Sequence, residues 1–372
     1  MSLKISKSDK KFMDLAISLA EDRVGLTGSN PSVGCVIVNK SQIISVGQTG
    51  IGGTPHAETV AIKSAKKEDL RGSSMYVTLE PCNHYGRTPP CTKQIIKNKI
   101  YKVFFGVNDV DIRTSGKTTK ILNNFNIKVK NNVQIKKILN LYKSYFFLKK
   151  HDYPFVTGKI ACTKDYYIKT NRKYISNPHS LNFSHLLRYK NQGILVSSKT
   201  VNSDNPQLNC RLNGLLKYSP TRFVLDKNLD ISLKSKLVKN SKKIKTFIFY
   251  NKSNSKLKKL KKMGIKFVYT NLTQNNNLDL IHVLKKIKKL NVYYLLVEGG
   301  IELTNYFILK KLFNEFFLLK SGKNIKNKKR FSKYKFENRI LNIFSNKETI
   351  NTYLGKDKII NCLLYTSDAA DD

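Results

Sequence analysis

Short runs of β-branched and aromatic residues alternate with helical stretches along this chain, and this alternation constrains the fold more than any other feature. Apolar residues at helical spacing predict a helix over 8–23. Further helices are predicted over 55–65, with Pro55 in its first turn, over 92–97 and over the aromatic stretch 142–150. The predicted strands share a short, mainly apolar run, and they are 33–38, 43–46, 74–79, 101–107, 155–160, 193–196, 221–225, 246–250, 266–269, 292–297 and 359–364. Such alternation is typical of an α/β fold whose sheet is covered on both faces.

The length of the chain predicts two domains. Its 372 residues exceed a usual single core. An aromatic helical stretch ends in Lys149 and Lys150, and His151-Asp152-Tyr153-Pro154 then breaks it. We therefore expect one domain over 1–150 and a second over 151–364. Residues 366–372 are acidic and small, and we expect 365–372 to be a disordered tail or a segment foreign to the coding sequence.

The charge balance of the chain is strongly basic. The sequence holds 68 Lys and Arg residues against 25 Asp and Glu residues, which gives a formal net charge of +43. Such a charge attracts polyanions, including nucleic acids. The excess is mostly lysine and is spread from Lys4 to Lys358, which indicates a drift in composition rather than a binding stripe. We expect no specific nucleic-acid partner and keep a nucleic-acid-binding protein as an alternative.

The six cysteines and the N-terminus indicate a cytoplasmic protein. The cysteines lack the dense, regular spacing of a secreted disulfide scaffold, and a reducing compartment suits them. The first residues lack an apolar signal core, and no run approaches the roughly 20 apolar residues of a membrane span. We therefore expect no membrane partner, and a homo-oligomer is compatible with the sequence.

Two segments together carry the ligands of a zinc site. His56 and Glu58 lie in one segment, and Cys82 and Cys91 lie in the other. A lone His-Ala-Glu or a lone cysteine is uninformative, but one imidazole and two thiolates give a tetrahedral Zn²⁺ three ligands and leave a position for water. Zinc lowers the pKa of that water, and a carboxylate close to the histidine can take its proton. We predict His56, Cys82 and Cys91 as ligands and Glu58 as the catalytic acid–base residue.

Segments 30–38, 56–58 and 79–91 resemble the bifunctional riboflavin-biosynthesis deaminase/reductase family, within the cytidine deaminase-like superfamily. Nucleoside and RNA-editing deaminases of that superfamily typically carry Cys-x2-Cys, whereas the longer Cys82–Cys91 spacing is similar to the riboflavin enzyme; an RNA-editing deaminase is an alternative. The resemblance implies a three-layer α/β/α domain, the same zinc ligands and proton shuttle, and substrate contacts from Asn30, His84, Arg87 and Asp109. The family usually shows Asp-Pro-Asn-Pro where this chain reads Asp109-Val110-Asp111-Ile112.

Residues 153–364 resemble the reductase half of the same family, which has a dihydrofolate reductase-like α/β fold. Val297-Glu298-Gly299-Gly300 runs from a predicted strand into a helix, where backbone N–H groups can approach a phosphate. The resemblance implies NADPH as cofactor, with contacts from Ala161, Tyr174, Thr200, Asp204, Gly299, Gly300, Ile301, Glu302, Leu303 and Thr304. It also implies contacts with a phosphosugar substrate from Lys159, Arg188, Leu208, Arg211 and Glu298.

The reductase half departs from the family at several positions. Thr163-Lys164-Asp165-Tyr166 stands where the family has Ser-Leu-Asp-Gly, so a bulky ring replaces a glycine that permits a tight turn. The loop that follows is shorter, Tyr174 stands where Trp is usual, and Leu319-Lys320-Ser321-Gly322-Lys323 replaces Pro-Lys-Leu-Leu-Gly. A deaminase with an inactive reductase half is therefore an alternative.

The resemblance as a whole implies an enzyme of two successive steps in riboflavin biosynthesis. The first is zinc-dependent hydrolytic deamination of 2,5-diamino-6-ribosylamino-4(3H)-pyrimidinone 5′-phosphate. The second is NADPH-dependent reduction of the ribosyl group to a ribityl chain. The expected cofactors are one Zn²⁺ in the deaminase domain and NADPH, and the expected partner is this small phosphosugar pyrimidine.

Overall fold

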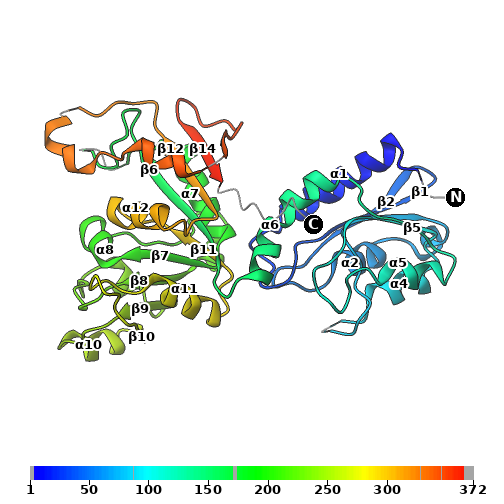
Figure 1. The fold of residues 1–372 in the computed structure, drawn as a ribbon, viewed down its shortest axis with the longest axis horizontal. Coiled ribbons are helices and arrows are strands. Elements are labelled where there is room, and N and C mark those ends of the chain that lie inside the picture. Colours follow the sequence, from blue (N-terminus) through cyan, green and yellow to red (C-terminus); the bar gives the residue numbers. More distant parts are fainter. Residues whose placement is uncertain (1–3, 87, 171–173, 327, 345, 364–372) are drawn as a thin grey trace. The chain divides into compact units, whose positions relative to one another are not determined.

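The structure is a computed structural model that describes residues 4–86, 88–170, 174–326, 328–344 and 346–363. It forms two compact α/β units, Met1–Asp152 and Tyr153–Asp372, and each is described by itself (Figure 1). Arg87 and the predicted tail 365–372 lie outside the described residues. Within the described ranges, no helix combines the length and apolar character that crossing a membrane requires.

The first unit contains a five-stranded sheet with the order β2-β1-β3-β4-β5. β1 pairs antiparallel with β2, as the predicted hairpin, and also with β3, whereas β3, β4 and β5 are parallel. Nearly every residue of β1, β3 and β4 is buried, because these central strands are covered on both faces. The strands are β1 (Gly34–Asn39), β2 (Gln42–Gln48), β3 (Ser74–Leu79), β4 (Lys102–Val107) and β5 (Lys128–Lys130).

Helices cover the two faces of this sheet and complete the predicted three layers (Figure 1). α1 and α6 pack against each other on one face, while α2, α4 and α5 lie on the other. α1 begins with a capping box, in which the side chains of Ser6 and Asp9 each accept from the other's backbone N–H. The helices are α1 (Lys7–Glu21), α2 (Ala57–Ser64), α3 (Lys67–Leu70), α4 (Cys91–Lys97), α5 (Thr118–Asn123) and α6 (Ile135–Lys150).

The start of α2 differs from the sequence prediction. Pro55 was expected in the first helical turn, but the helix begins at Ala57 and His56 is its N-cap residue. The backbone of His56 is extended, with φ −70° and ψ 153°, so Pro55 lies before the helix. This extended residue sets the imidazole at the very start of the helix, beside the loop that follows β3.

The second unit contains a nine-stranded sheet with the order β10-β9-β8-β7-β11-β6-β12-β14-β13. The strands from β10 to β12 are parallel, and β14 and β13 extend the sheet in antiparallel pairing. The sequence prediction missed β12 and β13. The strands are β6 (Phe155–Cys162), β7 (Gly193–Ser197), β8 (Thr221–Leu225), β9 (Thr246–Tyr250), β10 (Lys266–Tyr269), β11 (Tyr294–Val297), β12 (Glu315–Lys320), β13 (Asn346–Thr349) and β14 (Lys358–Leu363).

Two apolar cores lie on opposite faces of this second sheet. Ile194 and Val196 of β7 belong to one core, and Leu195 between them belongs to the other, because successive strand residues point to opposite faces. α11 and α12 contribute to the core of Leu195, and α7, α8, α9 and α10 to the other core. The elements are α7 (Pro178–Lys190), α8 (Ser198–Asp204), α9 (Lys236–Lys239), α10 (Lys256–Lys262), α11 (Leu280–Lys289), α12 (Ile301–Leu309), and the 3₁₀ turns η1 (Leu216–Tyr218), η2 (Lys328–Tyr334) and η3 (Asn338–Ile343).

Candidate active sites

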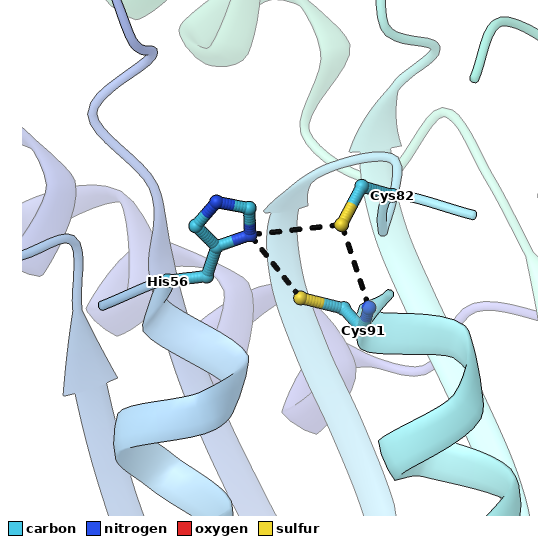
Figure 2. A group of neighbouring side chains, drawn as sticks. All are labelled: His56, Cys82 and Cys91. Atoms are coloured by element: carbon cyan, nitrogen blue, oxygen red, sulfur yellow. Dashed lines mark hydrogen bonds between the residues drawn. The ribbon is translucent and has the colours of Figure 1, made fainter. Parts of the chain in front are cut away.

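Three side chains converge in the first unit where α2, α4 and the loop after β3 meet (Figure 2). His56 precedes α2, Cys82 follows β3, and Cys91 is the first residue of α4. The His56 Nδ1 atom lies 3.4 Å from Cys91 Sγ and 3.6 Å from Cys82 Sγ. The three potential ligand atoms all lie within 4.8 Å of one another. The structure therefore brings together the three residues that the sequence predicted as metal ligands.

The chemistry of this donor set fits zinc. The hydrogen bond from Cys91 lowers the pKa of the Cys82 thiol to about 4, and the contact with His56 acts in the same direction. The pKa of Cys91 is raised well above its usual value by its contact with Cys82 and by burial. One thiolate is thus favoured even without an ion, and a divalent cation would favour the second. An imidazole and two sulfurs are typical of a zinc centre with an open fourth position.

Glu58 lies beside the three donors, in the first turn of α2. Its side chain is buried, and burial raises the pKa of its carboxyl group. It lines a cavity of about 280 Å³ together with His56 and Cys82. The same cavity is lined by three of the predicted substrate contacts, Asn30, His84 and Asp109. A buried acid next to a metal-type donor set, facing a cavity, has the placement that proton transfer requires.

Two loops position the predicted substrate contacts of this cavity. The Asn30 amide donates to the Gly53 carbonyl at 3.0 Å, and Gly53 adopts a left-handed φ of +94°. A side chain on Gly53 would also approach Asn30 Nδ2 to 2.6 Å, so both the conformation and the close approach require glycine. His84 Nδ1 lies 3.1 Å from Thr114 Oγ1, which ties the loop after β3 to the loop after β4.

Glu80 anchors the loop that follows β4, a role that the sequence prediction missed. Its buried carboxylate accepts three backbone N–H bonds, from Asp109 at 3.1 Å, Gly116 at 3.0 Å and Thr118 at 3.0 Å. Charge-assisted bonds of this kind are stronger than neutral ones. The sequence offered a signal, because an acid sits directly between a buried strand and the Pro81-Cys82 pair.

The anchored loop places charged side chains at the cavity. Asp109 accepts from Tyr145 OH at 2.9 Å, and burial raises the pKa of its carboxyl group. Asp111 pairs with Arg113 through two bonds, Nη2 to Oδ2 at 2.6 Å and Nε to Oδ1 at 2.9 Å. Lys149 Nζ lies 3.9 Å from Asp111 Oδ2. The sequence prediction named only Asp109 of these residues, although Asp111, Arg113, Tyr145 and Lys149 also line the cavity.

In the second unit, the structure gathers three predicted substrate contacts into one buried cluster. Arg188 donates to both carboxylate oxygens of Glu298, at 2.8 and 2.9 Å, and Lys159 Nζ lies 3.8 Å from Glu298 Oε2. Burial alone would raise the pKa of Glu298, but the charges of Arg188 and Lys159 lower it to about 2. Burial lowers the pKa of Lys159. The cluster holds two cations against one anion, which leaves a net positive site.

The loop that carries Arg211 is tied to α7 beside this cluster. His185 Nδ1 accepts from the Arg211 backbone N–H at 3.3 Å, and Arg188 donates to the Asn209 carbonyl at 3.2 Å. Burial and the charges of Arg188 and Arg211 lower the pKa of His185 to about 4, so the ring is a neutral acceptor near pH 7. Leu208, also a predicted contact, is buried with a left-handed φ of 53°. His185 was missed by the sequence prediction.

The start of α12 has the form of a phosphate cradle. Gly300 is the N-cap residue of this nine-residue helix and provides no side-chain cap, so first-turn N–H groups are left for another acceptor. A carbon added to Gly300 would lie 3.7 Å from Thr200 Oγ1, so two predicted cofactor contacts face each other. A carbon added to Gly299 would approach the Leu303 side chain to 2.9 Å. This cradle fits the phosphates of a dinucleotide such as NADPH.

The remaining predicted cofactor contacts differ in their surroundings. Ala161 lies in β6 beside Leu319, and Ile301 and Thr304 lie in α12. Glu302 pairs with Lys199 at 2.8 Å on the exposed surface. Asp204 ends α8, and Tyr174 is 49% exposed.

Tyr166 adopts the left-handed conformation that its position demands. Its φ is +68°, in the region that a glycine enters without cost. Lys320 donates to its hydroxyl at 3.0 Å and lies 4.1 Å from its ring centroid. The turn is therefore kept despite the bulky ring, and it is held by a residue from the end of β12.

The fold and the two sites define a class of protein, a zinc deaminase joined to an α/β reductase. Residues 6–107 match the zinc-binding region of cytidine and deoxycytidylate deaminases, and residues 154–323 match the RibD C-terminal domain. The riboflavin biosynthesis protein RibD of Aquifex aeolicus is 35% identical over 313 residues, which cover 83% of this chain and 86% of that protein. The chain belongs to the RibD family of bifunctional riboflavin biosynthesis proteins.

Other relatives and solved structures agree with this membership. RibD of Bacillus amyloliquefaciens is 33% identical over 82% of each chain. The structure of Acinetobacter baumannii RibD matches with a TM-score of 0.79 and 25% identity, covering 97% of this chain and 99% of that one. A deaminase/reductase of Thermotoga maritima matches with a TM-score of 0.77 and 28% identity, covering 96% and 99%. The predicted family, fold class, enzyme class and the cofactors zinc and NADPH are confirmed.

Proposed function

We propose that the two units catalyse successive steps on one small phosphosugar pyrimidine. The first removes an amine from 2,5-diamino-6-ribosylamino-4(3H)-pyrimidinone 5′-phosphate, and the second reduces the ribosyl group to a ribityl chain. The observation that carries this proposal is the convergence of His56, Cys82, Cys91 and Glu58 at one cavity, in a chain of the RibD family. The Thermotoga maritima relative is named for the corresponding deaminase and reductase activities.

In the first step, His56, Cys82 and Cys91 would hold the zinc ion and Glu58 would move the proton. When bound, zinc supplies a Lewis acid that lowers the pKa of a water molecule at its open position. Glu58 would carry a proton between water and the leaving amine, a role that its buried place beside the donors supports. Asn30, His84 and Asp109 hold the substrate in the cavity, together with Arg87 in our proposal.

In the second step, the cluster around Glu298 would hold the phosphosugar and α12 would hold the cofactor. When bound, NADPH supplies the hydride that reduces the ribose C1′. Arg188 and Lys159 give the cluster a net positive charge, and Arg211 comes from the loop braced by α7. Arginines suit phosphate because their planar donors bind two oxygens at once. Leu208 would add an apolar contact to this site.

We also propose the domain bounds, location and partners of the protein. Residues 1–150 would form the deaminase domain and 151–364 the reductase domain. The protein would act in the cytoplasm, on a small-molecule substrate and without a specific nucleic-acid partner. The basic charge, spread over the whole chain, supports electrostatic attraction rather than sequence-specific recognition.

A two-step assay of the purified protein tests the proposal. We expect zinc-loaded protein to release ammonia from the diaminopyrimidinone substrate, and then to oxidise NADPH with the deaminated product. Glu58→Gln should keep its zinc but release no ammonia, because the three ligands remain and the proton carrier is lost. Normal ammonia release by that variant would contradict the mechanism.

A second candidate is a deaminase whose reductase unit is inactive. Tyr166 favours it, because a side chain in the left-handed region stands where the family has glycine. NADPH titration separates the two candidates. Saturable binding and oxidation support the bifunctional enzyme, whereas no saturable binding up to millimolar cofactor would leave only the deaminase.

A further inference from the structure

The cavity of the first unit carries an excess of negative charge for the substrate that we propose. Glu58, Glu80, Asp109 and Asp111 all line it. The Glu80 carboxylate is occupied by three backbone N–H groups, and Asp109 accepts from Tyr145 and from the Asp111 backbone. Asp111 differs from these because its partner is a cation rather than a neutral group. The Asp111 side chain is 14% exposed, so a phosphate-bearing ligand in this cavity would meet its negative charge.

Arg113 is the main cation that compensates Asp111. Its Nη2 and Nε atoms engage both oxygens of the carboxylate, at 2.6 and 2.9 Å, and its backbone N–H donates to Oδ1 at 3.1 Å. This pairing lowers the pKa of Asp111, mainly through the hydrogen bonds from the Arg113 side chain. Lys149 is farther away, at 3.9 Å. Asp111 therefore stays ionised, and its acceptor sites are taken by Arg113.

The pair changes what the wall of the cavity offers to a ligand. A carboxylate alone can only accept hydrogen bonds, whereas a guanidinium can only donate them. Because Arg113 itself lines the cavity, the paired side chains present donors and a local charge near zero.

We propose that Arg113 is a positioning residue for the deamination step, acting through Asp111. Its positive charge neutralises the negative charge of Asp111, which would otherwise repel the phosphosugar, and its guanidinium supplies a hydrogen-bond donor at the cavity wall. This inference rests on the proposed function, because it assigns an anionic substrate to the cavity. A purely structural role does not explain the pair, since the Arg113 side chain is 60% exposed and exposed ion pairs contribute little to stability.

The test compares Arg113→Ala, Asp111→Asn and the double variant in the zinc-loaded, full-length protein. We expect Arg113→Ala to raise the KM for deamination about tenfold, with kcat and zinc content unchanged, because a bare carboxylate then faces the phosphosugar. Asp111→Asn alone should change KM by less than about threefold, since it removes the charge that Arg113 compensates. The double variant should return KM close to that of the unchanged protein.

A matched control is Lys137→Ala, which breaks an ion pair with Asp14 at 2.8 Å in the same unit. The Lys137 side chain is 58% exposed and does not line the cavity, so KM should stay unchanged. An unmoved KM in Arg113→Ala, or a double variant no better than Arg113→Ala, would overturn the inference while leaving the proposed function intact. Absence of ammonia release from the unchanged protein would overturn the proposed function and this inference with it.

Discussion

Replacing Glu80 by Gln tests whether one buried carboxylate organises the deaminase cavity. The carboxylate accepts N–H groups of Asp109 and Gly116 at Oε2 and of Thr118 at Oε1. A glutamine amide has one oxygen and one NH₂ group, so in its better orientation it keeps the two bonds at Oε2. The N–H of Thr118 then faces another donor. Leaving one buried donor unsatisfied costs about 1–3 kcal/mol.

This cost has a measurable size in hydrogen exchange. If the loop loses about 2 kcal/mol of local stability, its amides should exchange roughly 30-fold faster, since about 1.4 kcal/mol is a factor of ten. We expect the acceleration at the Asp109, Gly116 and Thr118 amides, with zinc retained and the KM for deamination raised. Glu68→Gln, an exposed acid in α3, is the control and should exchange normally. Unchanged exchange at the three amides in Glu80→Gln would refute the anchoring role.

Three further predictions concern the other contacts. Cys91→Ala should lose both bound zinc and ammonia release, because only two protein ligands remain. The control Cys362→Ala, in β14, should keep both. Metal analysis measures the zinc content, and a zinc-replete Cys91→Ala protein would show that the third ligand is another residue. Gly300→Val should fold, since an added carbon meets Thr200 Oγ1 only at 3.7 Å, but it should weaken NADPH binding. Arg211→Ala should weaken binding of the phosphosugar and leave NADPH binding unchanged. Calorimetric titration of each ligand measures both affinities, and the same loss of affinity for both ligands in both variants would refute separate sites. The pKa of His185 is lowered from 6.5 to about 4, so its contribution to the stability of the fold is complete above pH 6.5 and is lost as the pH falls towards 4. The unfolding temperature of His185→Asn should therefore depend less on pH between 6.5 and 4 than that of the unchanged protein. The same pH dependence in both proteins would contradict the assignment.

The sequence predicted the zinc site well because its chemistry is local. His56 and Glu58 are two residues apart, and Cys82 and Cys91 belong to one loop between β3 and α4. Only the packing of α2 against α4 was needed to bring these two segments together. Residue types with narrow chemical uses, at the start of predicted elements, therefore carried most of the information.

The residues that sequence analysis missed act through contacts that leave little local pattern. Glu80 and His185 accept hydrogen bonds from backbone groups, and any residue type except proline could supply those N–H donors. Arg113 pairs with a residue two positions away in a loop that no periodicity describes. The error at Pro55 has a similar origin, because a proline before a helix and a proline in its first turn give the same sequence signal.

The described contacts of the zinc site lie within the first unit, and those of the Glu298 cluster lie within the second. Because one polypeptide carries both units, every translated copy delivers the two catalysts in a fixed ratio of one to one. Gene expression can therefore raise or lower the two steps only together. Any adjustment of one step against the other must come from substitutions within a single unit, and selection can act on either site separately.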